Sequence, residues 1–328
     1  KTPTVYSDAP LVSQQSSMAA AELPSVDEFK LIDSDIPAET VAPSAQTTLD
    51  TGRLVKVETA VLEVWVDLLG GDIARVQLPT YPISLDQPET PFLLMDRSAG
   101  RTYIAQSALI GPDGIDKTGA RPLYDVEKST VTMNSGGELI LTTTLEDARV
   151  AKIFSFTPNS HLINVRYEVV NLGDQAKNMR LLTQIKRDRL PPPTDETVPL
   201  APSPYLGGAL TTPDNNYEKV DFDDLDEGSF EAATVGGWMA FLQHYFLTAW
   251  VAPADQATNY LARKTSEGFY LFGFTGQNQS VPSGATGTWQ ASFYAGPKDQ
   301  VVLENIAPYL NLTAVSYTHL RAHETSRN

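Results

Sequence analysis

His161 and His244 are the side chains best suited to acid–base chemistry in this chain. The chain has 328 residues and contains no cysteine. The other two histidines, His319 and His323, lie in the last thirteen residues, SYTHLRAHETSRN. His161 follows a Pro-Asn-Ser turn, so its side chain is expected to be exposed. His244 lies among apolar residues, so we expect partial burial with a backbone hydrogen-bond partner. Acid–base catalysis would also need a carboxylate on the opposite side of the same substrate atom. Because these environments are ordinary for structural histidines, neither residue is predicted to be catalytic.

An acidic run at residues 221–231, DFDDLDEGSFE, holds six carboxylates and no base. Clustered oxygens suit Ca²⁺, but the spacing does not follow a calcium-binding loop. Counted from Asp221, the fifth position is Leu225, the sixth is Asp226 instead of glycine, and the twelfth is Ala232 instead of glutamate. The chain also lacks the GxxxxGK, GxSxG and HExxH motifs. We therefore predict a solvated acidic loop, with no catalytic residues, no cofactor and no metal.

The segment at 236–252, GGWMAFLQHYFLTAWVA, concentrates aromatic side chains. Such side chains can stack on a sugar or grip a peptide, because aromatic faces offer a large contact area. The i, i+4 and i+7 or i+8 spacing instead favours inward packing, with Gln243 facing outward. We predict core positions for the large apolar residues, namely Trp238, Phe241, Leu242, Tyr245, Phe246 and Trp250.

Charge and hydropathy exclude several classes of partner. The chain has 24 basic and 40 acidic residues, a formal charge of −16, and shows no basic patch. Nucleic acids and anionic lipid surfaces are therefore not expected as direct partners, because binding them depends on clustered Lys and Arg. The most apolar stretch, Trp238–Ala252, is shorter than the roughly 20 residues of a membrane-spanning helix and has Gln243 and His244 at its centre. The N-terminal residues show no signal-peptide pattern.

Alternating apolar residues predict many short strands. Leu62, Val64 and Val66 alternate with polar neighbours, Gly70-Gly71 can form a tight reversal, and residues 73–78 run back as a hairpin partner. Further faces with period two are Leu139/Leu141/Thr143/Leu145, Ile163/Val165/Tyr167/Val169 and Trp289/Ala291/Phe293/Ala295, while residues 269–274 are apolar on both faces. This pattern predicts an all-β fold, a large antiparallel β-sandwich.

Prolines and one helical pattern interrupt the strands. Pro79 and Pro82 are expected to stop strand pairing and to leave Tyr81 in a surface crossing. The range 191–204, which begins with three prolines, is predicted to be an extended surface loop. Residues 301–312 have apolar side chains at i, i+3, i+4 and i+7 spacing, which predicts a short amphipathic helix that Pro308 breaks or kinks.

Five sequence strings resemble one family. They are GGDIARVQLPTYPISLDQPETPFLLMD from residue 70, RPLYDVEK at 121–128, TTPDNNYEKVDFDD at 211–224, GGWMAFLQHYFLTAWVA at 236–252 and IAPYLNLT at 306–313. In this order they resemble the large periplasmic domain of the bacterial membrane protein insertase YidC, over roughly residues 54–313. The resemblance implies a supersandwich similar in fold to galactose mutarotases, with a short helical element at its C-terminal end.

The domain organisation combines the resemblance with composition. Residues 1–53, rich in Ser, Ala, Pro and Thr, are predicted to be a flexible acidic linker in which 26–36 forms at most a transient helix. Residues 54–300 are the predicted sandwich, and 301–315 a helical connector. Residues 316–328 resemble translated adapter sequence and are predicted to be a non-native tail. In the family, a signal anchor precedes this domain and insertase helices follow it, so we interpret the chain as a truncated piece.

The resemblance also implies a role and a location. In the family, membrane-embedded helices insert nascent inner-membrane proteins, and the periplasmic domain is a non-catalytic accessory that contacts Sec translocon components at the periplasmic face of the inner membrane. We expect such contacts around residues 191–231, because this region is proline-rich and acidic. One alternative is a carbohydrate-binding or mutarotase-like sugar-active sandwich, in which a histidine and a glutamate would converge on one cleft. Another is a purely structural spacer.

Overall fold

The computed structural model describes residues 51–84, 86–116, 121–191 and 205–314. The elements are η2 (Thr51–Arg53), β1 (Leu54–Glu58), β2 (Glu63–Asp67), β3 (Asp72–Ser84), β4 (Gln87–Ser98), β5 (Arg101–Ile110), β6 (Thr130–Thr132), β7 (Gly137–Thr144), β8 (Ala148–Phe156), β9 (Leu162–Asn171), β10 (Lys177–Arg187), β11 (Gly207–Leu210), β12 (Glu218–Val220), α1 (Phe222–Glu227), β13 (Phe230–Val235), β14 (Trp238–Leu242), β15 (Phe246–Val251), β16 (Ala257–Lys264), β17 (Tyr270–Gly276), β18 (Gln279–Val281), β19 (Thr286–Pro297), α2 (Gln300–Ile306) and η3 (Leu310–Ala314). The predicted linker, its transient helix, the tail and nearly all of the proline-rich loop lie outside these residues.

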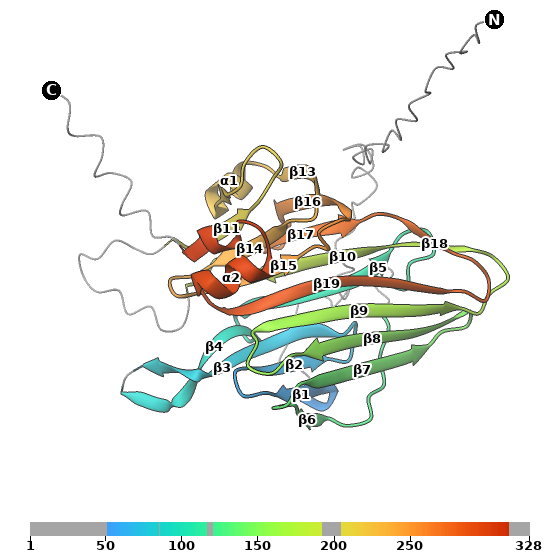
Figure 1. The fold of residues 1–328 in the computed structure, drawn as a ribbon, viewed down its shortest axis with the longest axis horizontal. Helices are drawn as coiled ribbons and strands as arrows, with labels where there is room; N and C mark the ends of the chain where they lie inside the picture. The colour runs from blue at the N-terminus through green and yellow to red at the C-terminus, as the bar shows by residue number, and fades with distance from the viewer. Residues whose placement is uncertain (1–50, 85, 117–120, 192–204, 315–328) are drawn as a thin grey trace, which may run out of the picture.

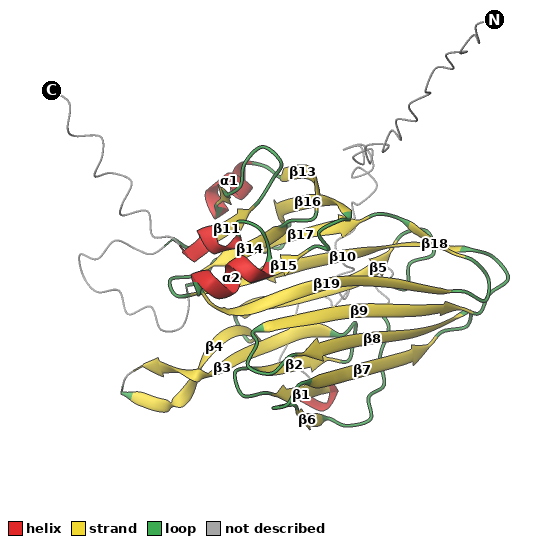
Figure 2. Ribbon diagram, in the orientation of Figure 1, coloured by secondary structure: helices red, strands yellow, loops and turns green. Residues whose placement is uncertain are grey.

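Two large sheets form the molecule (Figure 1). One has eleven strands, in the order β13-β16-β17-β10-β5-β4-β3-β2-β1-β6 with β18 beside β10, and the other has eight, in the order β12-β11-β14-β15-β19-β9-β8-β7. Neighbouring strands are antiparallel except for the pair β1–β6, which is parallel. Figure 2 shows how little helix accompanies these strands. The prediction of an all-β antiparallel sandwich is therefore confirmed.

The predicted hairpin at residues 62–78 forms as the alternation indicates. β2 pairs with β3 so that Val64 opposes Val76. The side chains of Leu62, Val64 and Val66 are fully buried. Gly70 and Gly71 have φ values of 77° and 65°, a left-handed conformation that glycine adopts without steric cost. The turn is therefore set by its glycines and the register by its buried face.

The main core lies between the two sheets and contains the period-two faces predicted from sequence. Ile163, Val165, Tyr167 and Val169 of β9 are all buried in it. Hydrogen bonds also join the sheets. Tyr103 Oη on β5 lies 2.7 Å from Thr248 Oγ1 on β15, and Trp250 Nε1 donates to the Gln184 carbonyl on β10 at 3.0 Å. Apolar burial and satisfied polar groups thus hold the layers face to face.

A second core lies on the outer face of the eight-stranded sheet, under the C-terminal helical element. Leu303, Ala307 and Leu310 pack there against buried residues of β14 and β15. Trp238 Nε1 donates to the Pro308 carbonyl at 3.0 Å. The predicted helix is broken at the proline, as expected: α2 ends at Ile306 and η3 begins at Leu310.

Pro79 and Pro82 were expected to end strand pairing, and this expectation is wrong for the strand as a whole. β3 continues through both prolines and pairs with β4, with register shifts between Leu78 and Pro82 and between Pro82 and Ser84. Irregular pairing at these positions tolerates the missing N–H groups. Tyr81 is half-buried and packs against the main core.

Candidate functional site

The aromatic segment forms the hairpin β14–β15. Five of its large apolar residues are buried as predicted, but Tyr245 is 68% exposed and Gln243 is only 2% exposed. The prediction had assumed helical spacing, but the segment forms two β-strands. The Gln243 N–H donates to the Phe246 carbonyl at 2.9 Å, which closes a two-residue loop made of His244 and Tyr245. Loop residues point into solvent, so the polar and aromatic positions are reversed relative to the prediction.

Both histidines differ from the expectations. His244 is exposed, and its ring stacks on Tyr245 with centroids 4.0 Å apart. His161 is half-buried beside Tyr81 and Tyr294, and burial lowers the pKa of its imidazole. Its backbone carbonyl accepts a hydrogen bond from Ala295, which explains how a residue after a turn lies over the sheet.

A pocket at one end of the sandwich brings segments that are distant in sequence together. It encloses about 560 Å³ and is lined by Tyr81, Pro82, Ile83, Phe92, Gln243, His244, Tyr245, Phe246, Pro297, Lys298 and Asp299. These residues come from β3, β4, the β14–β15 loop and the junction of β19 with α2. We call this cavity the end pocket. Sequence periodicity could not reveal it, because its walls belong to both sheets.

One histidine and one carboxylate, His244 and Asp299, line the end pocket together. Asp299 Oδ1 accepts hydrogen bonds from the Val301 and Val302 N–H groups at 3.0 and 3.1 Å, so this carboxylate caps α2. His161 does not line the end pocket.

The acidic run is not a loop, as had been predicted, but begins with α1. Asp221 caps the helix and forms a reciprocal capping box with Asp224. Asp226 pairs with Lys264 at 2.7 Å and with Arg189 at 3.0 Å. Among the residues described, no group of three or more His, Asp and Glu side chains could hold a metal ion. The carboxylates of this segment start and anchor a helix.

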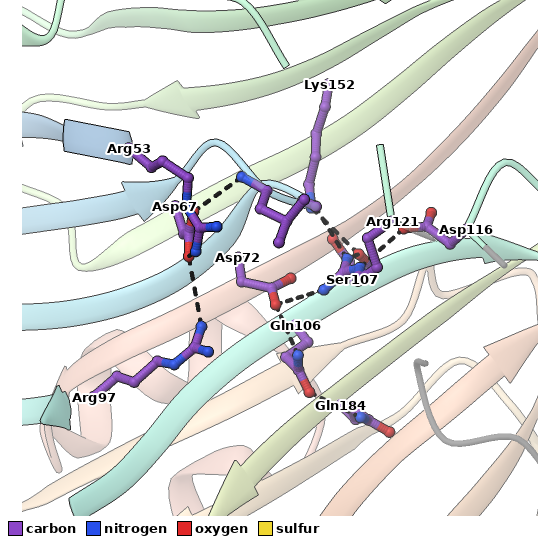
Figure 3. Close-up of polar contacts among 12 residues, drawn as sticks. Arg53, Asp67, Asp72, Arg97, Gln106, Ser107, Asp116, Arg121, Lys152 and Gln184 are labelled. Carbon is purple, nitrogen blue, oxygen red and sulfur yellow. Dashed lines mark hydrogen bonds and ion pairs between the residues drawn. The ribbon is translucent and has the colours of Figure 1, made fainter. Parts of the chain in front are cut away.

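A polar cluster, absent from the sequence predictions, lies between the sheets (Figure 3). Arg121 donates to Asp72 at 2.5 Å and to Asp116 at 3.1 Å, and also to the Gly70 and Ser107 carbonyls. From the opposite sheet, Lys152 Nζ donates to the same two carbonyls at 2.9 and 3.3 Å. We call Asp72, Ser107, Asp116, Arg121, Lys152 and Tyr167 the inter-sheet cluster. It ties the β2–β3 turn to β5 and β8.

Burial sets the protonation behaviour of the inter-sheet cluster. The pKa of Lys152 is lowered to about 7. The main cause is desolvation by burial, and Arg121 acts in the same direction, whereas Asp72 and Asp116 oppose the shift. Burial also raises the pKa of Asp116 despite its contact with Arg121. A perturbed lysine can mark a reaction site. Lys152 is fully buried, however, and no member of the cluster lines the end pocket, so its arrangement is that of a structural anchor.

One signal in the sequence could have revealed Lys152. It shares the inward face of β8 with Ala148, Val150 and Phe154, all of which are buried. A lysine at such a position needs internal acceptors. Arg187 is buried in a similar way on β10, with its guanidinium 4.3 Å from the Tyr103 ring centroid. Alternation therefore locates buried cations, although it does not identify their partners.

Comparison with known proteins gives one family and a set of distant folds. The family model described as YidC periplasmic domain matches residues 54–321. The protein named membrane protein insertase YidC from Cellvibrio japonicus is 40% identical over 287 residues, which cover 85% of this chain and 52% of that protein. Its counterpart from Ectopseudomonas mendocina is 37% identical over 340 residues, covering 94% and 58%. The chain thus spans about half the length of the curated relatives it matches.

Solved structures resemble the chain only at low sequence identity. A galactose mutarotase related enzyme from Lactobacillus acidophilus aligns with a TM-score of 0.46 and 11% identity, covering 74% of this chain and 97% of that one. The galactosidase domain of an alpha-galactosidase-sucrose kinase aligns with a TM-score of 0.46 and 10% identity, covering 79% and 43%. By the match over residues 54–321, the chain belongs to the YidC periplasmic domain family.

Proposed function

We propose that this domain is a non-catalytic accessory of a YidC insertase at the periplasmic face of the bacterial inner membrane. In this role it assists the insertion and folding of inner-membrane proteins by contacting Sec translocon components. The observation that carries the proposal is the family match over residues 54–321, together with relatives that are named membrane protein insertases. No helix among the described residues is long and apolar enough to cross a membrane.

Two observations support a role through contact without catalysis. The perturbed ionisable groups of the inter-sheet cluster are buried and paired. The carboxylate in the end pocket caps a helix. A folded domain held near the membrane raises its effective concentration at the translocon, so weak contacts would suffice.

We propose that the contact surface includes the acidic segment around α1. Asp223 and Glu227 are exposed on this helix, and the chain's charge of −16 favours a basic partner. The test places a photo-crosslinking amino acid at Glu227 in a full-length family member carrying this domain, in native membranes. Adducts with a Sec subunit are expected from Glu227 and not from Glu138, an exposed residue of β7. Equal adducts from both positions, or none from any position in 205–231, would argue against this surface.

A second candidate function is sugar processing, which His244 and Asp299 favour by lining one aromatic pocket. Proton transfer at a pyranose oxygen needs such a pair within hydrogen-bond reach. Exchange spectroscopy by NMR measures interconversion of galactose anomers directly. Acceleration by the purified domain that disappears in both His244→Ala and Asp299→Asn would establish this function; a rate equal to that in buffer would remove it.

A further inference from the structure

The end pocket has aromatic walls supplied by both sheets. Phe246 of β15 contacts Phe92 of β4, with ring centroids 4.4 Å apart, and Tyr81 of β3 edge-on at 5.3 Å. Its volume of about 560 Å³ lies within the range of small-ligand sites. Tyr245 stands 68% exposed at the rim. The pocket can therefore take a large apolar side chain and still offer a flat contact surface at its mouth.

Gln243 is the unusual polar group of the end pocket. Its side chain is buried, and both its amide nitrogen and its amide oxygen have no hydrogen-bond partner among the described residues. A buried unpaired carboxamide is destabilising, so its presence in a pocket wall needs an explanation. A carboxamide has one donor group and one acceptor group, the same pair that a peptide bond presents. A peptide group is thus the natural complement of Gln243.

Lys298 places a cation in the wall of the end pocket, next to the carboxylate of Asp299, which is engaged in capping α2. Its side chain lines the pocket, and it forms no ion pair with the described residues. The pKa of Lys298 is lowered to about 8, mainly by burial and also by nearby Lys219. Lys219 itself lies over the Tyr205 ring, 4.4 Å from its centroid. Lys298 lies near a second cation and forms no ion pair with a carboxylate of the described residues. This arrangement favours an anionic group in the ligand.

We propose that the end pocket binds an extended peptide that carries a large apolar side chain next to an acidic residue. The apolar side chain lies against Tyr81, Phe92 and Phe246. A peptide group of the ligand pairs with the carboxamide of Gln243, and the acidic group pairs with Lys298. A neutral sugar would satisfy the carboxamide but leave the lysine without a counter-charge, so the observations favour the peptide. This proposal is independent of the translocon role, because it concerns the domain alone.

Binding is measured by fluorescence anisotropy with the purified chain and a labelled seven-residue peptide whose centre is Leu-Phe-Glu. Matched probes replace the centre with Leu-Phe-Lys and with Ala-Ala-Glu. We expect the Leu-Phe-Glu peptide to bind at least fivefold more tightly than either. Equal affinity for all three peptides, or no saturable binding of the first, would overturn the proposal. Displacement of the peptide by galactose or cellobiose, with either sugar bound more tightly, would also overturn it and would favour a sugar site.

Two variants test the assigned groups. Lys298→Met should weaken Leu-Phe-Glu binding at least fivefold, whereas Lys128→Met, which removes an exposed lysine outside the pocket lining, should leave it unchanged. Gln243→Leu should weaken binding of the Leu-Phe-Glu peptide similarly. The urea midpoint of this variant should be equal to or above that of the parent, because an apolar group replaces an unpaired carboxamide. A lower midpoint with unchanged peptide binding would show that Gln243 is only structural. Equal effects of the two lysine variants would refute the ion pair.

Discussion

Single residues in this fold carry charge into the core. Lys152 lies between the two sheets with carbonyl acceptors on the turn before β3 and on β5. Arg121 donates hydrogen bonds to the same carbonyls and to the carboxylates of Asp72 and Asp116. The inter-sheet cluster therefore contains two basic and two acidic side chains. Replacing one partner of such a cluster leaves an uncompensated charge, which is why its members are coupled.

The buried lysine predicts a specific dependence of stability on pH. Because the folded pKa of Lys152 is about 7, below its ordinary value of 10.5, the unfolded chain binds a proton that the folded chain lacks between these values. The free energy of unfolding should therefore gain up to about 1.4 kcal/mol per pH unit from this group as pH rises above 7. Urea titrations of the parent and of Lys152→Met at pH values between about 7 and 9 measure the contribution of Lys152. The free energy of unfolding of the variant should lack this dependence on pH.

The control for this experiment is Lys264→Met. Lys264 is exposed, and its pairing with Asp226 raises its pKa, so it remains charged in this range in both states. Its removal should leave the pH slope as in the parent. Identical slopes in the parent and in Lys152→Met would show that Lys152 does not titrate in the folded protein.

The glycine turn predicts a second residue-scale effect. A Cβ at Gly71 would lie 2.7 Å from Lys152 Cδ, in addition to the positive φ. Gly100 has a φ of 80° with nothing within 4 Å of a Cβ, so Gly100→Ala measures the backbone cost alone, about 1 kcal/mol. Gly71→Ala should cost about 1–3 kcal/mol more in urea unfolding. If Gly71→Ala lowers the free energy of unfolding by no more than Gly100→Ala does, the Lys152 side chain moves away from the added Cβ at no energetic cost.

At the scale of elements, the C-terminal helical segment is part of the folded body. α2 and η3 cover the outer face of β14 and β15 in a core of their own, separate from the one between the sheets (Figure 1). The bond from Trp238 to the Pro308 carbonyl fixes the break between the two helical pieces. Pro308 thus ends one helix and supplies an acceptor that joins the segment to the sheet.

This packing predicts different effects for two residues of the same helix. Leu303 is fully buried and Val301 is 70% exposed. Leu303→Ala should lower stability by about 2–4 kcal/mol through the cavity it leaves, while Val301→Ala should change it by less than about 0.5 kcal/mol. Urea unfolding measures the difference, and amide exchange of α2 shows whether the segment separates from the sheet. Similar small losses from both variants would mean that α2 is not docked in solution.

Elements with a clear period were predictable, and those built from special contacts were not. Alternation identified β9 and β19 because one face of each strand meets the core and the other does not. The aromatic segment was misassigned because β14 and β15 are buried on both faces, which removes the alternation. The acidic run was taken for a loop because its helix depends on the capping box at Asp221. The end pocket and the inter-sheet cluster were beyond reach, since they join distant strands.

At the scale of the whole molecule, charge limits which surfaces the domain can approach. With a net charge of −16, the chain should be repelled by anionic membranes. We expect no co-sedimentation with phosphatidylglycerol vesicles at about 0.15 M salt, where the Debye length is about 8 Å. Salt-sensitive vesicle binding would reveal a basic surface and contradict this expectation. Neutral phosphatidylcholine vesicles serve as the control for apolar insertion.

Deletion of the sandwich tests the proposed contact between this domain and the Sec translocon. In a full-length family member, the segment that corresponds to residues 54–300 is removed. The segment that corresponds to α2–η3 and the rest of that protein are kept. Co-purification of Sec subunits and protease protection of newly inserted proteins are then measured together. If the sandwich makes the contact, Sec subunits should no longer co-purify, while Sec-independent proteins should still be inserted. Unchanged recovery of Sec subunits together with unchanged insertion would mean that the domain is only a spacer and would rule out the proposed contact.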